Sequence, residues 1–248
     1  MTSGKSTREQ RAAKVKAQQA AMRKAESRRR NSIIAGAVVA VLVVVVGVAA
    51  LVQSSRNSTS DTSATPANFS GPGSTSVVLG QSSAPVTVTV FEDFQCPICQ
   101  QFEKNVGPTL TSLRDAGTVK VEYRSIAFLD RMSSTEYSTR ALNAAACVRD
   151  SSPDAFEKFH TALFENQPPE QSAGLPDSKL VELATSSGAS GVESCIKDQR
   201  FKDWTVKVTD AASKDGVNGT PTVRVNGTDL VNPTAEQLTA AVQKAAKG

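Results

Sequence analysis

Two cysteines separated by two residues are the side chains of this 248-residue sequence best suited to chemistry. The motif reads Cys96-Pro97-Ile98-Cys99 and follows the β-branched run 85–91, so the first thiol is expected at a helix N-terminus. Unpaired backbone amides and the positive end of the helix dipole favour a thiolate there. A thiolate attacks disulfides, and a stabilised thiolate also leaves from them readily. The spacing therefore predicts a thiol–disulfide exchange pair, with Cys96 as the exposed nucleophile and Cys99 as the resolving thiol.

The same motif has two other interpretations, a structural disulfide and half of a zinc site, because a single CxxC is a moderate signal. A zinc site would need Cys147 and Cys195, or the only histidine, His160, to join the motif. These residues are isolated in the sequence and lack the usual spacing of zinc ligands. We therefore expect neither a metal nor another cofactor.

The residues around the motif predict the elements that position it. Residues 85–91 alternate as a strand does, and the short run 77–79 suits an edge strand. A helix should begin at or just after Cys96, because apolar residues follow at four-residue spacing: Ile98, Phe102, Val106 and Leu110. Pro108 should kink this helix or start a new one. Residues 119–127 predict a second strand, parallel to the first if the helix is a right-handed crossover.

The second half of the chain contains helical patterns before strands return. Residues 133–215 show no convincing strand, which indicates a helical insertion. Two short strands, 222–225 and 229–231, flank an Asn-Gly pair, which is a strong hairpin signal. Residues 233–247 then close the chain as a helix, with Asn232 as its expected N-cap. We expect an α/β fold with a central mixed sheet flanked by helices and interrupted by the insertion.

A second feature, Thr220-Pro221, directly precedes the first hairpin strand. A proline in this place is commonly the boundary of an edge strand. A cis peptide bond would instead present backbone groups of Thr220 to an extended substrate opposite the thiols. Both residues are therefore candidate substrate-binding residues.

Residues 85–103, the helical insertion and residues 216–227 together resemble the DsbA-type branch of the thioredoxin superfamily, over about residues 76–247. The resemblance implies a thioredoxin-like core interrupted by a helical domain. It implies that the two cysteines of the motif are nucleophile and partner, and that Pro221 is a cis-proline beside the active site. Residues similar to those often found in such proteins stand at four supporting positions: Phe94, Pro97, Phe102 and Glu103.

The sequence departs from that family at three points. Many members carry a buried acid six residues before the first cysteine, where this chain has Val90. Assisted proton transfer would then fall to water or to one of three nearby acids: Glu92, Asp93 and Glu103. The strongest oxidants have histidine between the cysteines, whereas Ile98 adds no charge or donor, which predicts a milder potential. Thr220 is similar to the isomerase and reductase branches and leaves the direction of electron flow open.

The other two cysteines, Cys147 and Cys195, lie far apart within the predicted insertion. We interpret them as a structural disulfide; a second redox pair and two buried free thiols are the alternatives. His160 is expected to be a packing or surface residue, because it lies on an apolar helix. Phe94, beside the thiols, is a candidate wall of an apolar substrate groove.

The N-terminal third predicts a membrane anchor. Residues 33–52 are twenty uncharged, mainly aliphatic residues, long enough as a helix to cross the ~30 Å hydrocarbon layer. Residues 1–32 hold ten Lys and Arg against two Glu, which keeps the N-terminus cytoplasmic. The length of the apolar run and the lack of an A-x-A site favour an uncleaved anchor over a cleaved signal peptide. Residues 53–76, rich in Ser, Thr, Asn, Gly and Pro, predict a flexible linker to a catalytic domain of residues 77–248.

These features predict an extracytoplasmic enzyme. Beyond residue 32 the chain has 18 basic against 22 acidic residues, which argues against nucleic-acid binding. The resemblance implies an oxidase that transfers a disulfide to exported unfolded or reduced proteins and is reoxidised by a DsbB-like or VKOR-like membrane partner. A disulfide isomerase or reductase is the nearest alternative, and a non-catalytic polypeptide- or metal-binding module is the alternative of another class. We expect a monomer, because no segment indicates dimerisation.

Overall fold

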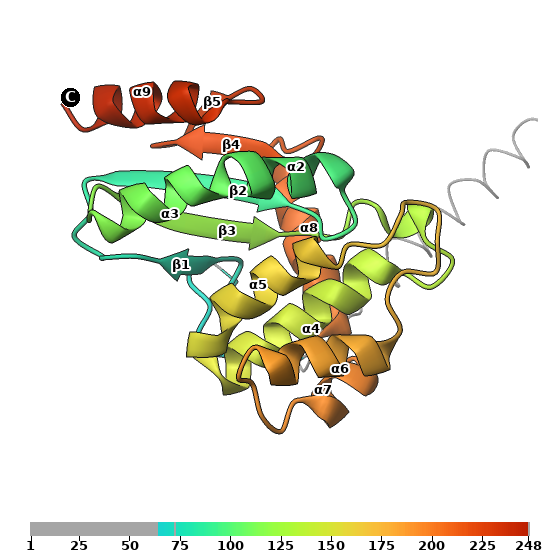
Figure 1. The fold of residues 1–248 in the computed structure, drawn as a ribbon. Helices are drawn as coiled ribbons and strands as arrows, with labels where there is room; N and C mark the ends of the chain where they lie inside the picture. Colours follow the sequence, from blue (N-terminus) through green and yellow to red (C-terminus); the bar gives the residue numbers. More distant parts are fainter. Residues whose placement is uncertain (1–63, 72, 248) are drawn as a thin grey trace, which may run out of the picture. The chain divides into compact units, whose positions relative to one another are not determined.

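A five-stranded mixed sheet holds the strand that leads into the CxxC motif (Figure 1). The structure is a computed structural model that describes residues 64–71 and 73–247. The predicted basic segment 1–32, the predicted transmembrane helix 33–52 and the first part of the predicted linker lie outside the described residues. Among the residues described, no helix is both long and apolar enough to cross a membrane.

The strands and helices follow one another in groups along the chain. The strands are β1 (Val77–Leu79), β2 (Val86–Glu92), β3 (Val119–Ser125), β4 (Thr222–Val225) and β5 (Thr228–Leu230). The helices that cover one face of the sheet are α2 (Pro97–Asn105), α3 (Gly107–Asp115) and α9 (Ala235–Ala245). Between β3 and β4 lie α4 (Tyr137–Ser151), α5 (Phe156–Glu165), α6 (Asp177–Ser186), α7 (Glu193–Lys197) and α8 (Lys202–Lys214), with 3-10 turns η1 (Asp130–Met132) and η2 (Pro153–Ala155).

The strand order is β1-β3-β2-β4-β5, which makes β2 the central strand. β2 pairs in parallel with β3, and α2 and α3 form the crossover between them. The remaining pairs are antiparallel. The β4–β5 turn uses Asn226 and Gly227, with φ of 46° and 81°, a left-handed conformation that Asn and Gly tolerate best. The parallel crossover and the hairpin confirm the sequence predictions.

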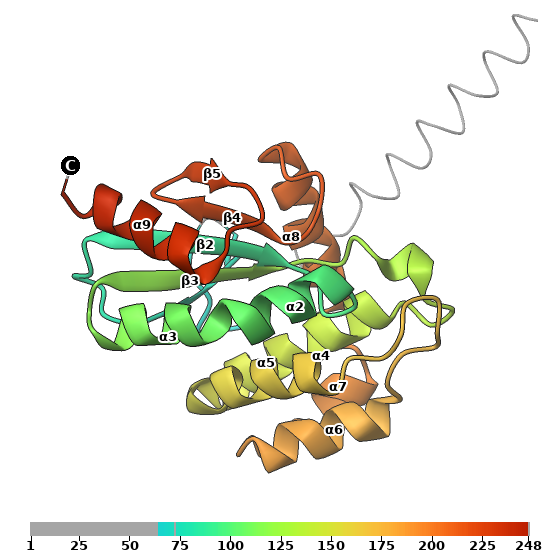
Figure 2. The same cartoon turned by 45° about the horizontal axis from the view of Figure 1, so that its top comes forward.

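Helices cover both faces of the sheet (Figure 2). On one face, α2, α3 and α9 bury the valines of β2, β3 and β4. On the other face, Phe91 of β2 packs with Ile126 and with Ala212 of α8. α2 ends at Asn105 and α3 begins at Gly107, because Pro108 fits the first turn of a new helix, where its missing N–H costs nothing.

The helices between β3 and β4 have a core of their own. α4 is its centre, since residues 137–148 are all buried against the surrounding helices. Cys147 of α4 and Cys195 of α7 form a disulfide with an S–S distance of 2.01 Å. Closing this loop of 48 residues stabilises the fold by ~4 kcal/mol in the chain-entropy model. Cys96 and Cys99 also belong to this helical core.

The predicted linker is wrong in its C-terminal half. From residue 64 onward this segment packs on the helical core, with Ala64 and Phe69 partly buried. The ring of Phe69 meets Trp204 edge-on at 4.8 Å, and the Trp204 Nε1 donates to the Ser74 carbonyl oxygen. The Ala67 N–H donates to the Asp150 carboxylate. A few well-placed contacts therefore order a stretch whose composition alone indicates a flexible chain.

The predicted start of the last helix also differs from the structure. Thr234, and not Asn232, is the N-cap of α9. The Thr234 hydroxyl accepts from the Gln237 N–H while the Gln237 side chain accepts from the Thr234 N–H. This reciprocal capping box satisfies two otherwise unpaired amides. With Asn232 as the N-cap, the third helical position would be Ala235, whose side chain cannot accept a hydrogen bond.

We predict that Phe69→Ala lowers the free energy of unfolding by about 2 kcal/mol, because it removes a partly buried ring and an aromatic pair. Urea denaturation would measure this loss. Trp204 is the only tryptophan in the chain, so its fluorescence should shift to the red in the folded variant. Val231→Ala, at a side chain 84% exposed, is the matched control. Equal stability of both variants would contradict the docking of this segment.

Candidate active site at the start of α2

The CxxC motif lies where β2 ends and α2 begins. Cys96 is the N-cap residue of α2, with φ −78° and ψ 115°, and Pro97 is the first helical residue. The Cys96 N–H donates to the Asp93 carbonyl oxygen, which closes the turn between strand and helix. Cys96 is 5% exposed and Cys99 is 1% exposed, and both are free thiols. The expected exposed nucleophile is thus largely covered, although Cys96 remains the more accessible thiol.

The Thr220–Pro221 bond is cis and lies beside the first thiol. In its thiol form, the Cys96 Sγ donates to the Thr220 carbonyl oxygen at 3.3 Å. The structure therefore brings together the residues that the sequence singles out from two distant segments: Cys96, Pro97, Ile98, Cys99, Thr220 and Pro221. The antiparallel pairing of β2 with β4 makes this possible, because it puts the end of one strand next to the start of the other.

The pKa values of the two thiols are shifted in opposite directions. Hydrogen bonds lower the Cys96 pKa to about 6, and the largest effect comes from the Cys99 thiol. Burial opposes this shift. The Thr220 side chain and the backbone N–H groups of Cys99 and Ile98 lower the pKa further. Burial raises the Cys99 pKa far above its ordinary value, and the neighbouring Cys96 adds to this effect. At neutral pH the pair therefore holds one thiolate, on Cys96, and one proton, on Cys99.

Hydrogen bonds between glutamine side chains and backbone carbonyl oxygens join the active-site loop and α2 to the helical segment. The Gln167 Nε2 donates to the carbonyl oxygens of Phe94 and Cys96, at 2.9 and 3.0 Å. The Gln100 Nε2 donates to the Phe164 carbonyl oxygen. The Gln95 Nε2 donates to the Met132 carbonyl oxygen. Nothing in the local sequence pattern indicates that these three glutamines hold the active-site loop.

A groove of about 350 Å³ lies next to the motif, between α2, the cis-proline and the start of α9. Ile98 projects into it and is 50% exposed. The other apolar walls are Phe102, Val106, Pro221 and Pro233. An extended polypeptide with an apolar side chain fits such a surface.

Phe94 does not line this groove, which corrects the sequence prediction. Its side chain is fully buried and packs against Phe164 and His160. The ring therefore supports the loop from inside, and Phe102 occupies the place at the groove that the sequence suggested for Phe94.

Asp93, one of the three candidate acids, faces away from the thiols. Its carboxylate accepts from the Gln95 N–H, the Leu129 N–H and the Ser138 hydroxyl. Burial raises the Asp93 pKa to about 7, although these hydrogen bonds lower it. The side chain fixes the turn before α2 to the helical segment.

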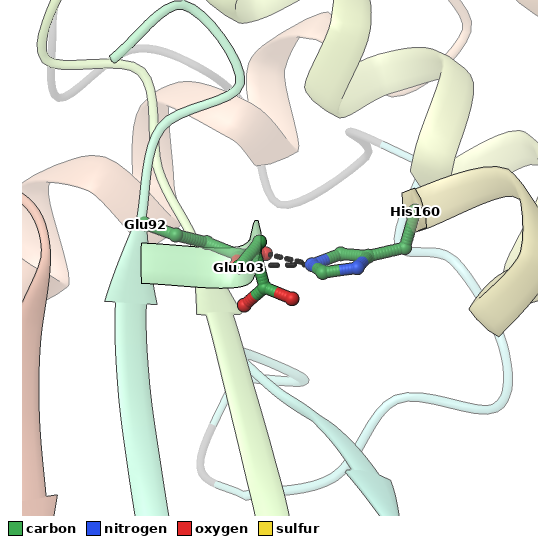
Figure 3. A group of neighbouring side chains, drawn as sticks. All are labelled: Glu92, Glu103 and His160. Carbon is green, nitrogen blue, oxygen red and sulfur yellow. Dashed lines mark hydrogen bonds and ion pairs between the residues drawn. The ribbon is translucent and has the colours of Figure 1, made fainter. Parts of the chain in front are cut away.

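The other two acids, Glu92 and Glu103, lie with His160 in one buried cluster (Figure 3). The His160 Nε2 lies 2.8 and 3.0 Å from the two oxygens of Glu92. Burial lowers the His160 pKa, but the charge and the hydrogen bond of Glu92, together with the charges of Glu103 and Glu157, raise it to about 9. Burial raises the Glu103 pKa to about 7, which His160 opposes and Glu92 reinforces. His160 is thus neither a surface residue nor a simple packing residue, as the sequence suggested.

The structure also decides between the metal alternatives that involve cysteine. Cys147 and Cys195 are bonded to each other, so they cannot join the CxxC motif in a zinc site. His160 contacts Glu92 rather than either thiol.

We predict that Thr220→Val raises the Cys96 pKa, because the side chain of Thr220 is one of the causes that lower it. The rate of iodoacetamide alkylation of the reduced protein should rise with pH through a midpoint near 6 in the parent. The variant should titrate about one pH unit higher, the usual value of a hydrogen bond to a charged group. Thr228→Val, on β5, is the control and should keep the parent midpoint. An unchanged midpoint in Thr220→Val would show that the hydroxyl does not stabilise the thiolate.

Comparison with known proteins gives a consistent result. The protein-family profile described as Thioredoxin matches residues 73–244. The chain is 30% identical over 176 residues to the disulfide bond formation protein D of Bacillus subtilis, covering 69% of this chain and 77% of that protein.

Solved structures show the same likeness. The reduced form of a disulfide bond oxidoreductase, DsbG, from Mycobacterium tuberculosis has 38% identity and a TM-score of 0.64, over 72% of this chain and 90% of that one. Oxidised DsbA from the same organism has 37% identity and a TM-score of 0.62, over 70% and 93% of the two chains. With its mixed sheet, its helices and its CxxC motif at a helix start, this chain belongs to the thioredoxin superfamily as a DsbA-like thiol:disulfide oxidoreductase.

Proposed function

We propose that the chain is a membrane-anchored, extracytoplasmic disulfide oxidase that introduces disulfide bonds into exported proteins. One observation carries the direction of the reaction: the protein stabilises the Cys96 thiolate, with a pKa lowered to about 6. Stabilising the thiolate stabilises the reduced form of the pair, and a pair whose reduced form is stabilised is a stronger oxidant. The stabilisation comes from Cys99, Thr220 and the helix start, so it does not require histidine in place of Ile98.

The proposed reaction starts from the oxidised pair. A substrate thiolate attacks the Cys96 sulfur, the Cys96–Cys99 bond breaks, and the Cys99 thiolate leaves and takes up a proton. A second substrate thiolate then attacks the substrate sulfur of the mixed disulfide and releases Cys96 as a thiolate. Two electrons pass to the enzyme, and the substrate gains one disulfide.

The groove beside Ile98 supports substrate binding. Reduced exported proteins expose apolar segments, and the groove offers an apolar wall next to the reactive sulfur. The carbonyl and amide groups of Thr220 are available to the backbone of an extended segment.

The proposed anchor is the apolar run 33–52, with the domain of residues 77–248 outside the cytoplasm and an N-terminus that stays inside. Relatives named disulfide bond formation protein D support a role in disulfide formation. We further propose a DsbB-like or VKOR-like membrane protein as the acceptor of the two electrons, and a monomeric enzyme.

The test of direction is the equilibrium of the full chain with glutathione buffers, followed by alkylation of free thiols. An oxidase predicts that Cys96 and Cys99 titrate together near about −120 mV, while Cys147 and Cys195 stay bonded. A value near about −180 mV would favour the isomerase alternative, and a value near about −270 mV, that of thioredoxin, would favour the reductase alternative. Absence of titration would favour a non-catalytic binding module.

Single substitutions in the motif should separate the roles of the two thiols. With a reduced protein substrate in the presence of oxidant, Cys99→Ser should accumulate a mixed disulfide through Cys96, since the resolving thiol is missing. Cys96→Ser should form no such adduct and should lose all oxidase activity. Adduct formation through Cys99 in Cys96→Ser would contradict these assignments.

We predict that Ile98→Gln lowers kcat/KM for a reduced protein substrate about tenfold, because the lost apolar contact is worth roughly 1.4 kcal/mol. The rate with glutathione, which is too small to use the groove, should change little. Val206→Gln, at another exposed apolar residue on α8, is the control. Equal losses with protein and glutathione would show that Ile98 acts on the thiols and not on substrate binding.

A further inference from the structure

The cluster of Glu92, Glu103 and His160 has no part in the reaction proposed above. Its three side chains come from β2, α2 and α5, and they point toward one another in Figure 3. One potential ligand atom from each residue lies within 4.8 Å of the others. Imidazole and carboxylate groups are common metal ligands, and here three of them converge from three elements.

The cluster is enclosed by protein. Glu92 is 1% exposed and His160 is 3% exposed. Aromatic rings surround the imidazole, with the ring of Tyr123 at 4.5 Å and that of Phe164 at 5.2 Å. These rings limit the access of water to the His160 side of the site.

Glu103 is held in the cluster without a full set of hydrogen bonds. Its Oε1 atom is buried and has no hydrogen-bond partner among the described residues. Its Oε2 atom would lie 3.1 Å from a Cβ at Gly107, so the glycine leaves the space that this carboxylate fills. A buried carboxylate oxygen without a donor is costly, and in a native protein it calls for an explanation such as a bound ion.

In the part of the chain described, neither carboxylate of the cluster pairs with lysine or arginine. A divalent cation bound to both carboxylates and to a neutral imidazole would give the cluster a net charge of zero.

We propose that Glu92, Glu103 and His160 form a binding site for a divalent transition-metal ion, with Zn²⁺ as the best-fitting ion. Imidazole and carboxylate ligands suit Zn²⁺, whereas Ca²⁺ and Mg²⁺ require more oxygen ligands than the cluster offers. Tetrahedral Zn²⁺ holds its ligand atoms about 3.4 Å apart. Glu92 and His160 must therefore separate slightly and Glu103 must move closer. Glu103 is the most exposed of the three, so a fourth ligand, such as water, would have to enter on its side.

Such an ion would join the active-site helix to the sheet and to the helical segment. Glu103 lies one helical turn after Cys99 on α2, and His160 lies on α5. The metal would thus fix the helix that carries both thiols to two other elements, independently of their redox state.

The test uses the full chain with Cys96→Ser and Cys99→Ser, because thiols would bind the metal themselves. Titration with Zn²⁺ in a calorimeter should give one site per chain. Co²⁺ should give the visible absorption of a tetrahedral complex. Glu103→Gln in the same background should weaken binding at least tenfold, since a ligand is lost. Glu165→Gln, an exposed acid on α5, is the control and should bind as the parent does.

Thermal unfolding gives a second readout that does not depend on calorimetric heats. Zn²⁺ should raise the Tm of the parent and of Glu165→Gln, because it binds the folded state, and should raise the Tm of Glu103→Gln by less at the same Zn²⁺ concentration. Glu103 is the residue to replace, since Gln is isosteric and the side chain is not fully buried. No binding of Zn²⁺ or Co²⁺ by a folded parent would overturn the proposal. An affinity for Zn²⁺ that Glu103→Gln leaves unchanged would overturn it as well, and would place the metal elsewhere.

Discussion

The sulfur of Cys96 can carry a negative charge only where protein groups replace the water that would solvate a thiolate. Most of the architecture around the motif supplies those groups. The start of α2 provides backbone N–H donors, Cys99 provides a thiol, and Thr220 provides a hydroxyl. Thr220 is 124 residues away in sequence, and the central position of β2 brings it into contact. The sheet therefore brings two short, distant segments of the chain into contact with the Cys96 sulfur.

The helical segment contributes to the same site from a third direction. Its residue Gln167 binds the carbonyl oxygens on either side of Gln95, and Asp93 accepts from groups of that segment. The loop before α2 is thus fixed by side chains and not by the sheet alone. A bare strand–helix junction would leave the orientation of Cys96 to local backbone preferences, whereas this one is held by bonds on both sides.

The sequence predicts the parts of the fold that depend on local patterns. The alternation in β2, the apolar spacing in α2, the position of Pro108 and the Asn-Gly hairpin each leave a local signature, and each element is present. The same holds for the CxxC motif and Thr220-Pro221, whose types and neighbours reveal their chemistry.

What the sequence could not predict depends on contacts between distant residues. Phe94 and Phe102 have the same type, and only the packing decides that the first is buried and the second lines the groove. His160 looks like a packing residue until β2 brings Glu92 next to it. The segment from residue 64 has a linker composition, yet a single aromatic pair with Trp204 helps to order it. Composition measures average tendencies, and one long-range contact can outweigh them.

Cys96 and Cys99, the proposed redox pair, are part of the buried core of the helical segment and not of the core beneath the sheet. Oxidation and folding of that core therefore belong to one thermodynamic cycle. The pair has one redox potential in the folded chain and another in the unfolded chain. Multiplied by nF, the difference between these two potentials equals the difference in folding free energy between the oxidised and the reduced protein. Any packing change in the helical core that favours one form, however far it lies from the sulfurs, must shift the redox potential by a corresponding amount. The helical segment is in this sense a tuning element for electron transfer, and the sheet can remain unchanged while the potential varies.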